Sequence, residues 1–304
     1  MHDLIVIGAG PAGMTAAIYA ARKNLSTLVL TKETGGQMAW SSDIENYSGF
    51  ELTTGIELTK KFKDHVLSIP EKLELKEGVE VVALEKNITT FVITDKQGKL
   101  YYSKSVIIAT GRKPRKLNIP GEDKFFGHGV ATCATCDAPF YKNKTVAVIG
   151  GGDSAMDALL SLSKTSKKLY SINLNLELSG DLVLKSKVEA LPQVTYFKQA
   201  KALEILGNKK VTGLKLQKKD GSEEALNLDG VFIEIGFEPE NNFENLTQKN
   251  HLGEIKVGKN LETNVPGLFA AGDVNDAWGE QIIIASGEGS KAALAVNNYL
   301  NKIR

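Results

Sequence analysis

The stretch that decides the fold is "DLIVIGAGPAGMTAAIYAARKN", residues 3–24. An apolar run, residues 4–7, predicts a buried strand, and the alanine-rich residues after 13 predict a helix. Between them Gly8, Gly10 and Gly13 form the pattern G-x-G-x-x-G. In this context the first glycine makes the tight turn, the second admits a pyrophosphate and the third lets helix and strand pack closely. The stretch therefore predicts a dinucleotide-binding fold, with a glycine-rich turn that binds no nucleotide as the alternative.

A second strand, "STLVLTKE" at residues 26–33, follows at the expected distance. In such folds an acidic residue about 20 residues after the glycine motif often holds a ribose hydroxyl. Here Thr31 takes that place and Glu33 comes slightly later. Thr31 is therefore predicted to contact the first nucleotide.

The same pattern recurs in "KTVAVIGGGDSAMDALLSLSK", residues 144–164. Gly150 and Gly152 make the turn, Asp153 and Ser154 begin the helix, and Ala155 replaces the third glycine, which is a common variant. The chain thus contains two dinucleotide-binding folds, and its fold class is α/β.

Composition limits the function classes. The 304 residues suffice for two domains, and 42% hydrophobic with 24% charged residues fits a soluble globular protein. A net charge of +1 predicts no nucleic acid partner, and no apolar run reaches the ~20 residues of a membrane span. The N-terminus carries Asp3 and no basic lead, so we expect no signal peptide. With only two cysteines, we expect a cytoplasmic protein in a reducing compartment.

Those two cysteines, Cys133 and Cys136, stand just before the second glycine turn. Cys-x-x-Cys beside a nucleotide fold is typical of a redox disulfide. Zinc would need four ligands, and His128 could be only a third; two buried, inert thiols are the other alternative. Asp137 follows directly and could pass a proton to a thiolate leaving group, or could serve a local turn.

At this point a resemblance is specific. "CATCD" at 133–137, just before "VAVIGGGDSA" at 146–155, lies in a chain that opens with "IGAGPAG" and closes with "GLFAAGDVND" at 267–276. This combination resembles the low-molecular-weight thioredoxin reductases over almost the whole chain. The resemblance implies two Rossmann-like domains, the second inserted into the first. We expect the first domain at 1–115 and 240–304 and the inserted domain, which carries the cysteines, at 116–239.

The resemblance also implies FAD in the first domain. Asp273 would bond a ribitol hydroxyl, and the helix near Gln281 would point its N-terminus at the isoalloxazine. "TGGQ" at 34–37 and "IENY" at 44–47 are similar to the family's FAD contacts. The residues expected to bind FAD are Gly8, Gly10, Pro11, Ala12, Gly13, Thr31, Gly36, Gln37, Asn46, Val81, Ala109, Gly111, Gly272, Asp273, Gln281 and Ile282.

By the family pattern, electrons pass from FAD to the Cys133–Cys136 disulfide and on to thioredoxin or a similar small dithiol protein. Cys136 would face the flavin, Cys133 would attack the substrate disulfide and Asp137 would be the acid. The inserted domain would have to rotate to expose the disulfide, and the family implies a homodimer.

The chain departs from the family where NADPH users carry an arginine-rich cluster for the 2′-phosphate. After "KLYSI" the sequence continues "NLNLELSGDL" at 173–182, with no arginine. Asn173 stands where an NAD enzyme would place an acid. Gly150, Gly152, Asp153, Ser154, Ala155 and Asn173 remain candidate contacts to NADPH or NADH. We expect both to be weak donors, which makes ferredoxin or another reductant a candidate.

Three alternative functions stay open. The "GEQIIIASGEGSKAAL" helix at 279–294 is also similar to the reductase of the alkyl hydroperoxide system. That reductase carries an additional dithiol domain, so we expect this chain to use a separate carrier. A flavin oxidase and a flavin-bound redox sensor without turnover are the others. Trp278 could stack on a ring, block a nicotinamide or pack its own loop.

Overall fold

The computed structural model describes residues 1–41 and 44–303 and divides into two compact units. Unit 1 comprises Met1–Lys113 and Glu238–Arg304, and unit 2 comprises Pro114–Phe237. These junctions differ by two residues at each end from the inserted domain predicted at 116–239.

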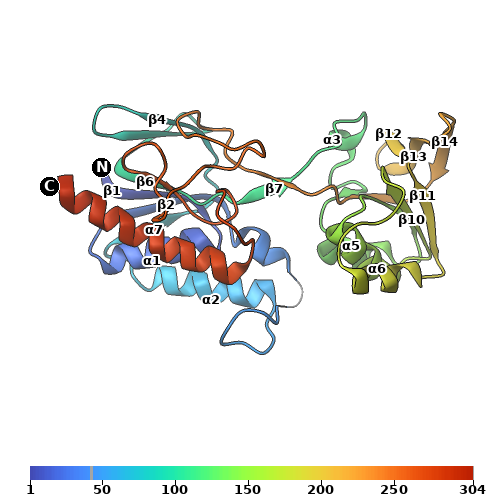
Figure 1. Cartoon of the computed structure of the whole chain (residues 1–304), viewed down its shortest axis with the longest axis horizontal. Helices are drawn as coiled ribbons and strands as arrows, with labels where there is room; N and C mark the ends of the chain where they lie inside the picture. Colours follow the sequence, from blue (N-terminus) through green and yellow to red (C-terminus); the bar gives the residue numbers. More distant parts are fainter. Residues whose placement is uncertain (42–43, 304) are drawn as a thin grey trace. The chain divides into compact units, whose positions relative to one another are not determined.

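Unit 1 is built on a seven-stranded sheet in the order β3-β2-β1-β6-β5-β4, with β17 also paired to β6 (Figure 1). The strands around β1 are parallel, whereas β4, β5 and β6 pair antiparallel. Leu4, Ile5 and Val6 are fully buried, as an uninterrupted apolar run in a parallel sheet requires. The strands are β1 His2–Ala9, β2 Thr27–Thr34, β3 Leu73–Lys76, β4 Val81–Lys86, β5 Phe91–Asp95, β6 Leu100–Ile108 and β17 Leu268–Ala270.

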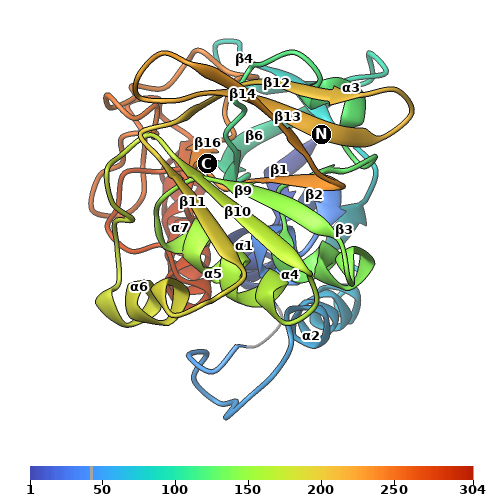
Figure 2. The same cartoon turned by 90° about the vertical axis from the view of Figure 1, so that its right-hand side faces the viewer.

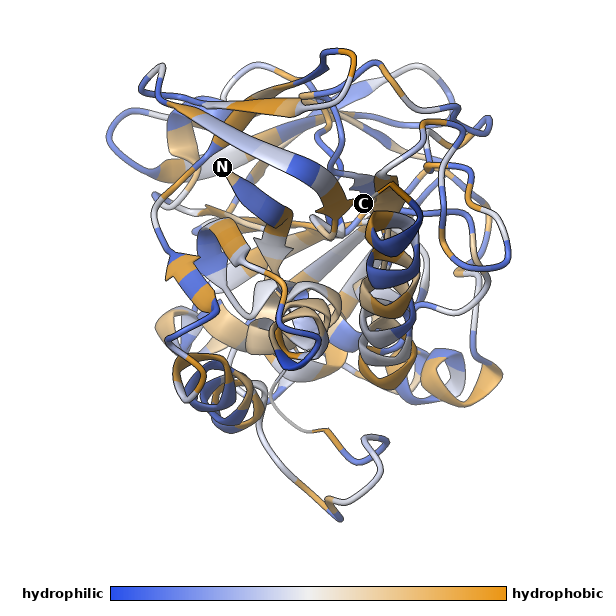
Figure 3. Ribbon diagram, turned by 90° about the vertical axis from the view of Figure 1, so that its left-hand side faces the viewer, coloured by the Kyte–Doolittle hydropathy of each residue, from blue (hydrophilic) through white to orange (hydrophobic). Residues whose placement is uncertain are grey.

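Helices α1 (Pro11–Arg22), α2 (Gly55–Leu67) and α7 (Ile282–Ile303) and the 3₁₀ turn η1 (Gly36–Trp40) complete unit 1. Pro11 occupies the first turn of α1, where a missing N–H costs nothing. A Cβ on Gly289 of α7 would lie 2.0 Å from the oxygen of Ala12, so glycine permits the close approach of α7 to α1. Hydrophobic and hydrophilic residues are mixed along α7 (Figure 3). Its buried residues, among them Ala285, Gly289, Ala292, Val296 and Leu300, recur every three or four positions, as expected for a helix with one buried face.

Unit 2 contains a parallel five-stranded sheet in the order β11-β10-β9-β15-β8 (Figure 2). A separate antiparallel sheet, β12-β13-β14, packs with it around a shared hydrophobic cluster. The strands are β8 Val130–Ala131, β9 Thr145–Ile149, β10 Lys168–Asn173, β11 Val194–Lys198, β12 Lys201–Gly207, β13 Val211–Gln217, β14 Glu223–Asn227 and β15 Gly230–Ile233. The helical segments are α3 Glu122–Phe125, α4 Ala134–Asp137, η2 Ala138–Tyr141, α5 Asp153–Ser163 and α6 Leu182–Glu189.

The chain passes between the units twice, through β7 (Arg112–Pro114) and β16 (Phe237–Pro239), which pair as a two-stranded sheet. The N–H of Arg115 donates to the oxygen of Gly236 at 2.9 Å. Unit 2 is therefore a continuous insertion held by two adjacent crossings. Across the described residues, the helices are all too short or too polar to pass through a membrane.

Candidate functional site

In the first glycine turn of unit 1, two of the three glycines lie against neighbouring backbone, and the third faces open space. Gly8 has φ +105°, and a Cβ there would lie 2.3 Å from the oxygen of Ala109. A Cβ on Gly13 would lie 2.0 Å from the oxygen of Gly8. On Gly10, the nearest atom to a Cβ would be the oxygen of Gly35, at 3.9 Å. A side chain at Gly10 would thus enter open space, and a pyrophosphate of FAD fits that cradle.

Other residues predicted to bind FAD gather around this turn. Gly36, with φ +55°, lies against Gly10, since a Cβ on Gly36 would be 3.8 Å from the Cα of Gly10. Gly272, with φ +76°, faces Ala12, whose Cβ would be 3.0 Å from a Cβ on Gly272. The segments 35–37 and 271–273 therefore border the cradle from two further elements.

Polar contacts join more of the predicted set. The amide of Asn46 donates to Oε1 of Gln281 at 2.9 Å, although 235 residues separate them. Nε2 of Gln37 donates to the oxygen of Arg112 at 3.3 Å, next to Gly111. Gln281 directly precedes Ile282, the first residue of α7.

Thr31 lies beside the first glycine turn, because Leu30, the residue before it, pairs with Ile7, the residue before Gly8. Thr31 is buried near the end of β2, and its hydroxyl donates to the oxygen of Glu33 at 2.5 Å. The N–H of Val79 donates to the oxygen of Thr31 at 2.9 Å, so the segment that leads to Val81 runs beside Thr31. Thr31 therefore adjoins both the glycine turn and the segment that leads to Val81.

Asp273 lies shortly after β17, and the residue is half-buried. Burial, then the negative charge of Glu280, raises the pKa of Asp273 to about 6, and the positive charge of Arg112 opposes that rise. Arg112 donates through Nε to the oxygen of Asp273 at 2.9 Å. It also forms ion pairs with Glu254 and, at 2.7 Å, with Glu280. The sequence analysis did not identify Arg112 as a residue of this site. The one sequence feature that could have marked it is its position directly after "ATG".

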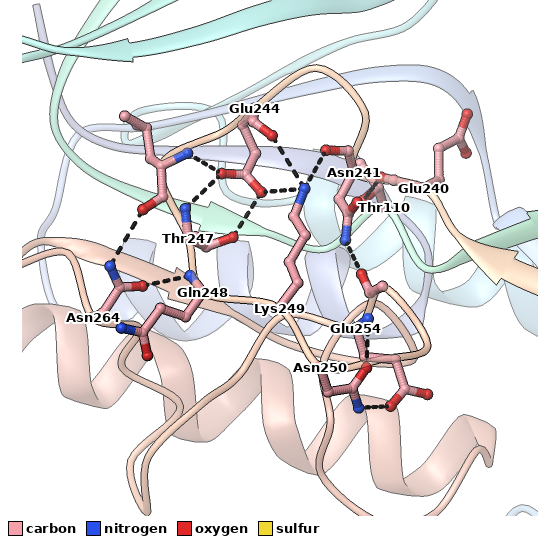
Figure 4. Close-up of polar contacts among 12 residues, drawn as sticks. Thr110, Glu240, Asn241, Glu244, Thr247, Gln248, Lys249, Asn250, Glu254 and Asn264 are labelled. Atoms are coloured by element: carbon pink, nitrogen blue, oxygen red, sulfur yellow. Dashed lines mark hydrogen bonds and ion pairs between the residues drawn. The ribbon is translucent and has the colours of Figure 1, made fainter.

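A polar network holds Glu254 in place (Figure 4). Asn250 donates through Nδ2 to Glu254 at 2.5 Å and accepts the N–H of Glu254 at 3.1 Å. Elsewhere in this loop, Glu244 is buried and pairs with Lys249 at 3.1 Å. Because Glu254 pairs with Arg112, this loop fixes the arginine that supports Asp273.

In unit 2, Cys133 and Cys136 form a disulfide across α4. Cys136 is exposed and Cys133 is half-buried. The N–H of Cys136 donates to Sγ of Cys133 at 3.2 Å. Each sulfur is bonded to the other. The described residues contain no cluster of three or more His, Cys, Asp or Glu that could hold a metal. Burial raises the pKa of the adjacent Asp137 carboxyl above its usual range.

The second glycine turn borders a cavity of about 640 Å³ within unit 2. Gly150 has φ +146°, and a Cβ there would lie 2.0 Å from the oxygen of Glu234. No atom lies within 4 Å of a Cβ on Gly152, so this turn also opens to space. Asp153 and Ser154 line the cavity, whereas Ala155 is fully buried beneath it.

Asn173 lines the same cavity but its amide is already engaged. Nδ2 donates to the oxygen of Glu177 at 2.8 Å, and Oδ1 accepts the N–H of Asn175 at 3.1 Å. Asp153 in turn accepts the N–H of Asp181 at 2.7 Å. The two predicted contacts thus hold the 173–181 loop against the glycine turn.

Cations are sparse at this cavity. Its lining includes Lys116 and Lys201, and the sequence has no arginine between residues 116 and 303. Lys185, on the nearby α6, pairs with Glu177 at 2.6 Å. At the mouth of the cavity the side chain of Leu174 is 70% exposed. These surroundings offer a 2′-phosphate little positive charge.

Trp278 does not pack its loop, because its side chain is 93% exposed. The loop-packing interpretation from the sequence is therefore wrong. The exposed indole lies three residues before Gln281, on the approach to α7.

Comparison with known proteins agrees with this geometry. Residues 2–289 match the family described as pyridine nucleotide-disulphide oxidoreductase. The F subunit of alkyl hydroperoxide reductase from Staphylococcus epidermidis is 38% identical over 301 residues, 98% of this chain but 59% of that protein. The chain therefore spans about 59% of the length of the curated relatives it matches.

Solved structures are similar over nearly their whole length. Thioredoxin reductase of Lactococcus lactis has a TM-score of 0.88 at 32% identity, covering 99% of this chain and 100% of that one. Thioredoxin reductase of T. acidophilum has a TM-score of 0.84 at 36% identity, covering 100% and 99%. A ferredoxin-flavin thioredoxin reductase of Clostridium acetobutylicum has a TM-score of 0.55 at 32% identity, covering 99% and 98%.

Proposed function

This chain belongs to the pyridine nucleotide-disulphide oxidoreductase family, and we propose that it acts there as an FAD-dependent disulfide reductase of thioredoxin-reductase type. One observation carries the proposal: the Cys133–Cys136 disulfide lies in the unit whose glycine turn borders a cavity, while a second glycine cradle lies in unit 1. FAD, held in the unit 1 cradle, would supply the electron pair that reduces this disulfide.

The cysteines then perform thiol–disulfide exchange. The Cys133 thiolate attacks one sulfur of a partner disulfide and expels the other as a thiolate. The Cys136 thiolate attacks the Cys133 sulfur, restores the Cys133–Cys136 bond and releases the second partner thiolate. The N–H of Cys136 that donates to Sγ of Cys133 supports the nucleophilic role of Cys133, because such a donor stabilises a thiolate.

Asp137 is the proposed acid for this exchange. Burial raises the pKa of its carboxyl, so the group keeps a proton closer to neutral pH than an exposed aspartate would. A proton from Asp137 would neutralise one departing thiolate, and solvent would supply the other.

The proposed partner is thioredoxin or a similar small dithiol protein, as the names of the structural neighbours suggest. A peroxiredoxin-system partner is the second candidate, because the curated relatives are alkyl hydroperoxide reductase subunits. Steady-state reduction of a thioredoxin by the full chain, followed through insulin or a dithiol reagent, separates an enzyme from a redox sensor. A homodimer, tested by sedimentation velocity, is part of the proposal.

The electron donor is proposed from the charge around the unit 2 cavity. Each charge-assisted contact to a phosphate contributes about 1.5–3 kcal/mol of binding free energy. The lack of a cation cluster therefore weakens the binding of NADPH by orders of magnitude. NADH has no 2′-phosphate and should lose less affinity. Asn173 nevertheless replaces the usual acid, and its amide is already hydrogen-bonded within the protein. A ferredoxin-like donor is the second candidate, supported by the name of the Clostridium acetobutylicum neighbour.

The test is anaerobic mixing of the oxidised protein with NADPH, NADH or reduced ferredoxin while flavin absorbance is followed. We expect NADH to act faster than NADPH, with both slow. The double variant Leu174→Arg with Asn175→Arg adds two cations at exposed cavity positions. It should accelerate reduction of the flavin by NADPH and leave reduction by NADH unchanged. Rapid, complete bleaching of the unmodified protein by micromolar NADPH would contradict the proposed donor order.

A further inference from the structure

Arg112 connects three other segments of unit 1. It begins β7, and its backbone oxygen accepts Nε2 of Gln37 at 3.3 Å. Its Nε donates to the backbone oxygen of Asp273 at 2.9 Å. Its Nη2 forms ion pairs with Glu254 and, at 2.7 Å, with Glu280. One guanidinium thus joins the segment of Glu254 to both ends of the segment 273–280.

The two carboxylates that pair with Arg112 differ in their exposure to water. The side chain of Arg112 is 16% exposed and that of Glu254 is 11% exposed, whereas that of Glu280 is 55% exposed. Glu254 is also held by Asn250, which donates to its carboxylate and accepts its N–H. A buried charge is costly to leave without a partner, so Glu254 anchors the guanidinium. Glu280 is the exposed partner that the anchored guanidinium then holds.

The segment that Arg112 holds carries two residues that are expected to bind FAD. It begins with Asp273, and Glu280 at its other end directly precedes Gln281. Trp278 within this segment is almost fully exposed, so packing of its indole does not fix the segment. The positive charge of Arg112 also lowers the pKa of Asp273, which places its electrostatic effect at the same part of the unit.

We propose that Arg112 is a positioning residue of the FAD site, which clamps residues 273–281 and through its charge raises the potential at which bound flavin is reduced. The inference deepens the proposed function and rests on its assignment of FAD to the unit 1 cradle. Two electrons and one proton add one negative charge to a flavin, and a nearby cation stabilises that charge. The charge of Glu280 acts in the opposite direction. Neither effect requires contact with the flavin, because Coulomb interactions extend over roughly 10 Å.

The experiment measures the reduction potential of the flavin in the full chain, by equilibration without oxygen against a redox dye of known potential. Both cysteines are replaced by serine in every form, so that no disulfide takes electrons from the flavin. Arg112→Gln should lower the ratio of reduced to oxidised flavin about tenfold at a fixed dye potential, or about 30 mV for a two-electron couple. Glu280→Gln should raise that ratio roughly threefold, a smaller effect because an exposed charge is screened more strongly.

Arg112→Lys separates the charge from the clamp. Lysine keeps the positive charge, but one ammonium cannot replace a guanidinium fork that reaches a carbonyl oxygen and two carboxylates. We expect the potential to stay near that of the form with Arg112, while titration of the flavin-free chain shows roughly tenfold weaker binding of FAD. Lys60→Gln and Asp64→Asn are the matched controls. They remove the charges of an exposed ion pair on α2 and should change neither measurement.

Opposite shifts in Arg112→Gln and Glu280→Gln support the proposal, because a general loss of structure would shift both potentials in the same direction. Unchanged potentials, or shifts of the same sign, overturn it. If Arg112→Gln does not retain FAD, the exposed Glu280 decides alone, and a ratio that fails to rise in Glu280→Gln overturns the proposal. Because the dye measurement needs neither a partner nor the redox disulfide, these results are distinct from a failure of the proposed disulfide reduction.

Discussion

Replacing Asp273 with asparagine should stabilise the flavin-free chain at neutral pH and weaken its binding of FAD. Burial holds the pKa of this carboxyl at about 6 rather than 3.8, which means that the folded chain resists its ionisation. Asparagine has nearly the same size and cannot ionise. The ionised aspartate thus destabilises the empty chain, and we expect the ribitol hydroxyl it is proposed to bind to offset that cost.

The size and sign of the effect follow from proton linkage. A rise from 3.8 to about 6 corresponds to about 3 kcal/mol of unfolding free energy. Since the folded pKa is the higher one, the folded state binds the extra proton between these values. Stability of the unmodified chain therefore falls as pH rises from about 4 through 6, and the full cost persists above pH 7. The variant should melt at a higher temperature there by roughly 6–12 °C, at roughly 2–4 °C per kcal/mol.

The assay is thermal unfolding of the flavin-free forms at several pH values between 4 and 8. The gap between the variant and the unmodified chain should close toward pH 4. In a Glu280→Gln background the gap should be smaller, because removal of that charge lowers the pKa of Asp273. Binding of FAD by the variant should be roughly tenfold weaker, since a charge-assisted hydrogen bond becomes a neutral one. A gap of the same size at pH 4 and pH 8 would refute the reasoning.

Three further changes test the proposed cradle and redox centre. Gly10→Val should abolish FAD binding with little loss of thermal stability, because the added side chain enters open space. Gly13→Val should instead destabilise the fold, because its side chain would meet the backbone of Gly8. Purified Gly10→Val that retained stoichiometric FAD would show that the motif was misread. Cys133→Ser and Cys136→Ser should each abolish disulfide reduction in a thioredoxin assay but leave the flavin reducible, and a mixed disulfide trapped through Cys136 rather than Cys133 would reverse their roles. Asp137→Asn should slow turnover by roughly 100- to 10,000-fold, the usual span for a lost general acid, and an unchanged rate would leave Asp137 as a turn residue.

Much of the fold was predictable because its signals are local. The conformations of Gly8 and Gly13 follow from a strand, a turn and a helix that are contiguous in sequence, and the contacts they make are those the motif predicts. The pair Cys133 and Cys136 is similarly local, and the disulfide was expected from its spacing.

Contacts between distant segments were the part that sequence could not supply. Arg112 gains its role from Glu254 and Glu280, which are more than 140 residues away, so no pattern around it marks that role. Asn173 was expected to face a ribose, and its amide is engaged by a loop whose conformation no motif describes.

The two adjacent crossings have a consequence for the order in which the protein can fold during synthesis. Unit 2 is continuous, and its last residue, Phe237, leaves the ribosome before β17 and α7 exist. Unit 1 cannot complete its fold before α7 is synthesised, because Gly289 of α7 packs against Ala12, a residue far earlier in the sequence. Domains generally fold as units as they emerge, and distant contacts form slowly. The inserted unit should therefore be native on nascent chains while the first glycine turn still lacks its covering helix, a sequence of events that protease protection of stalled chains would reveal.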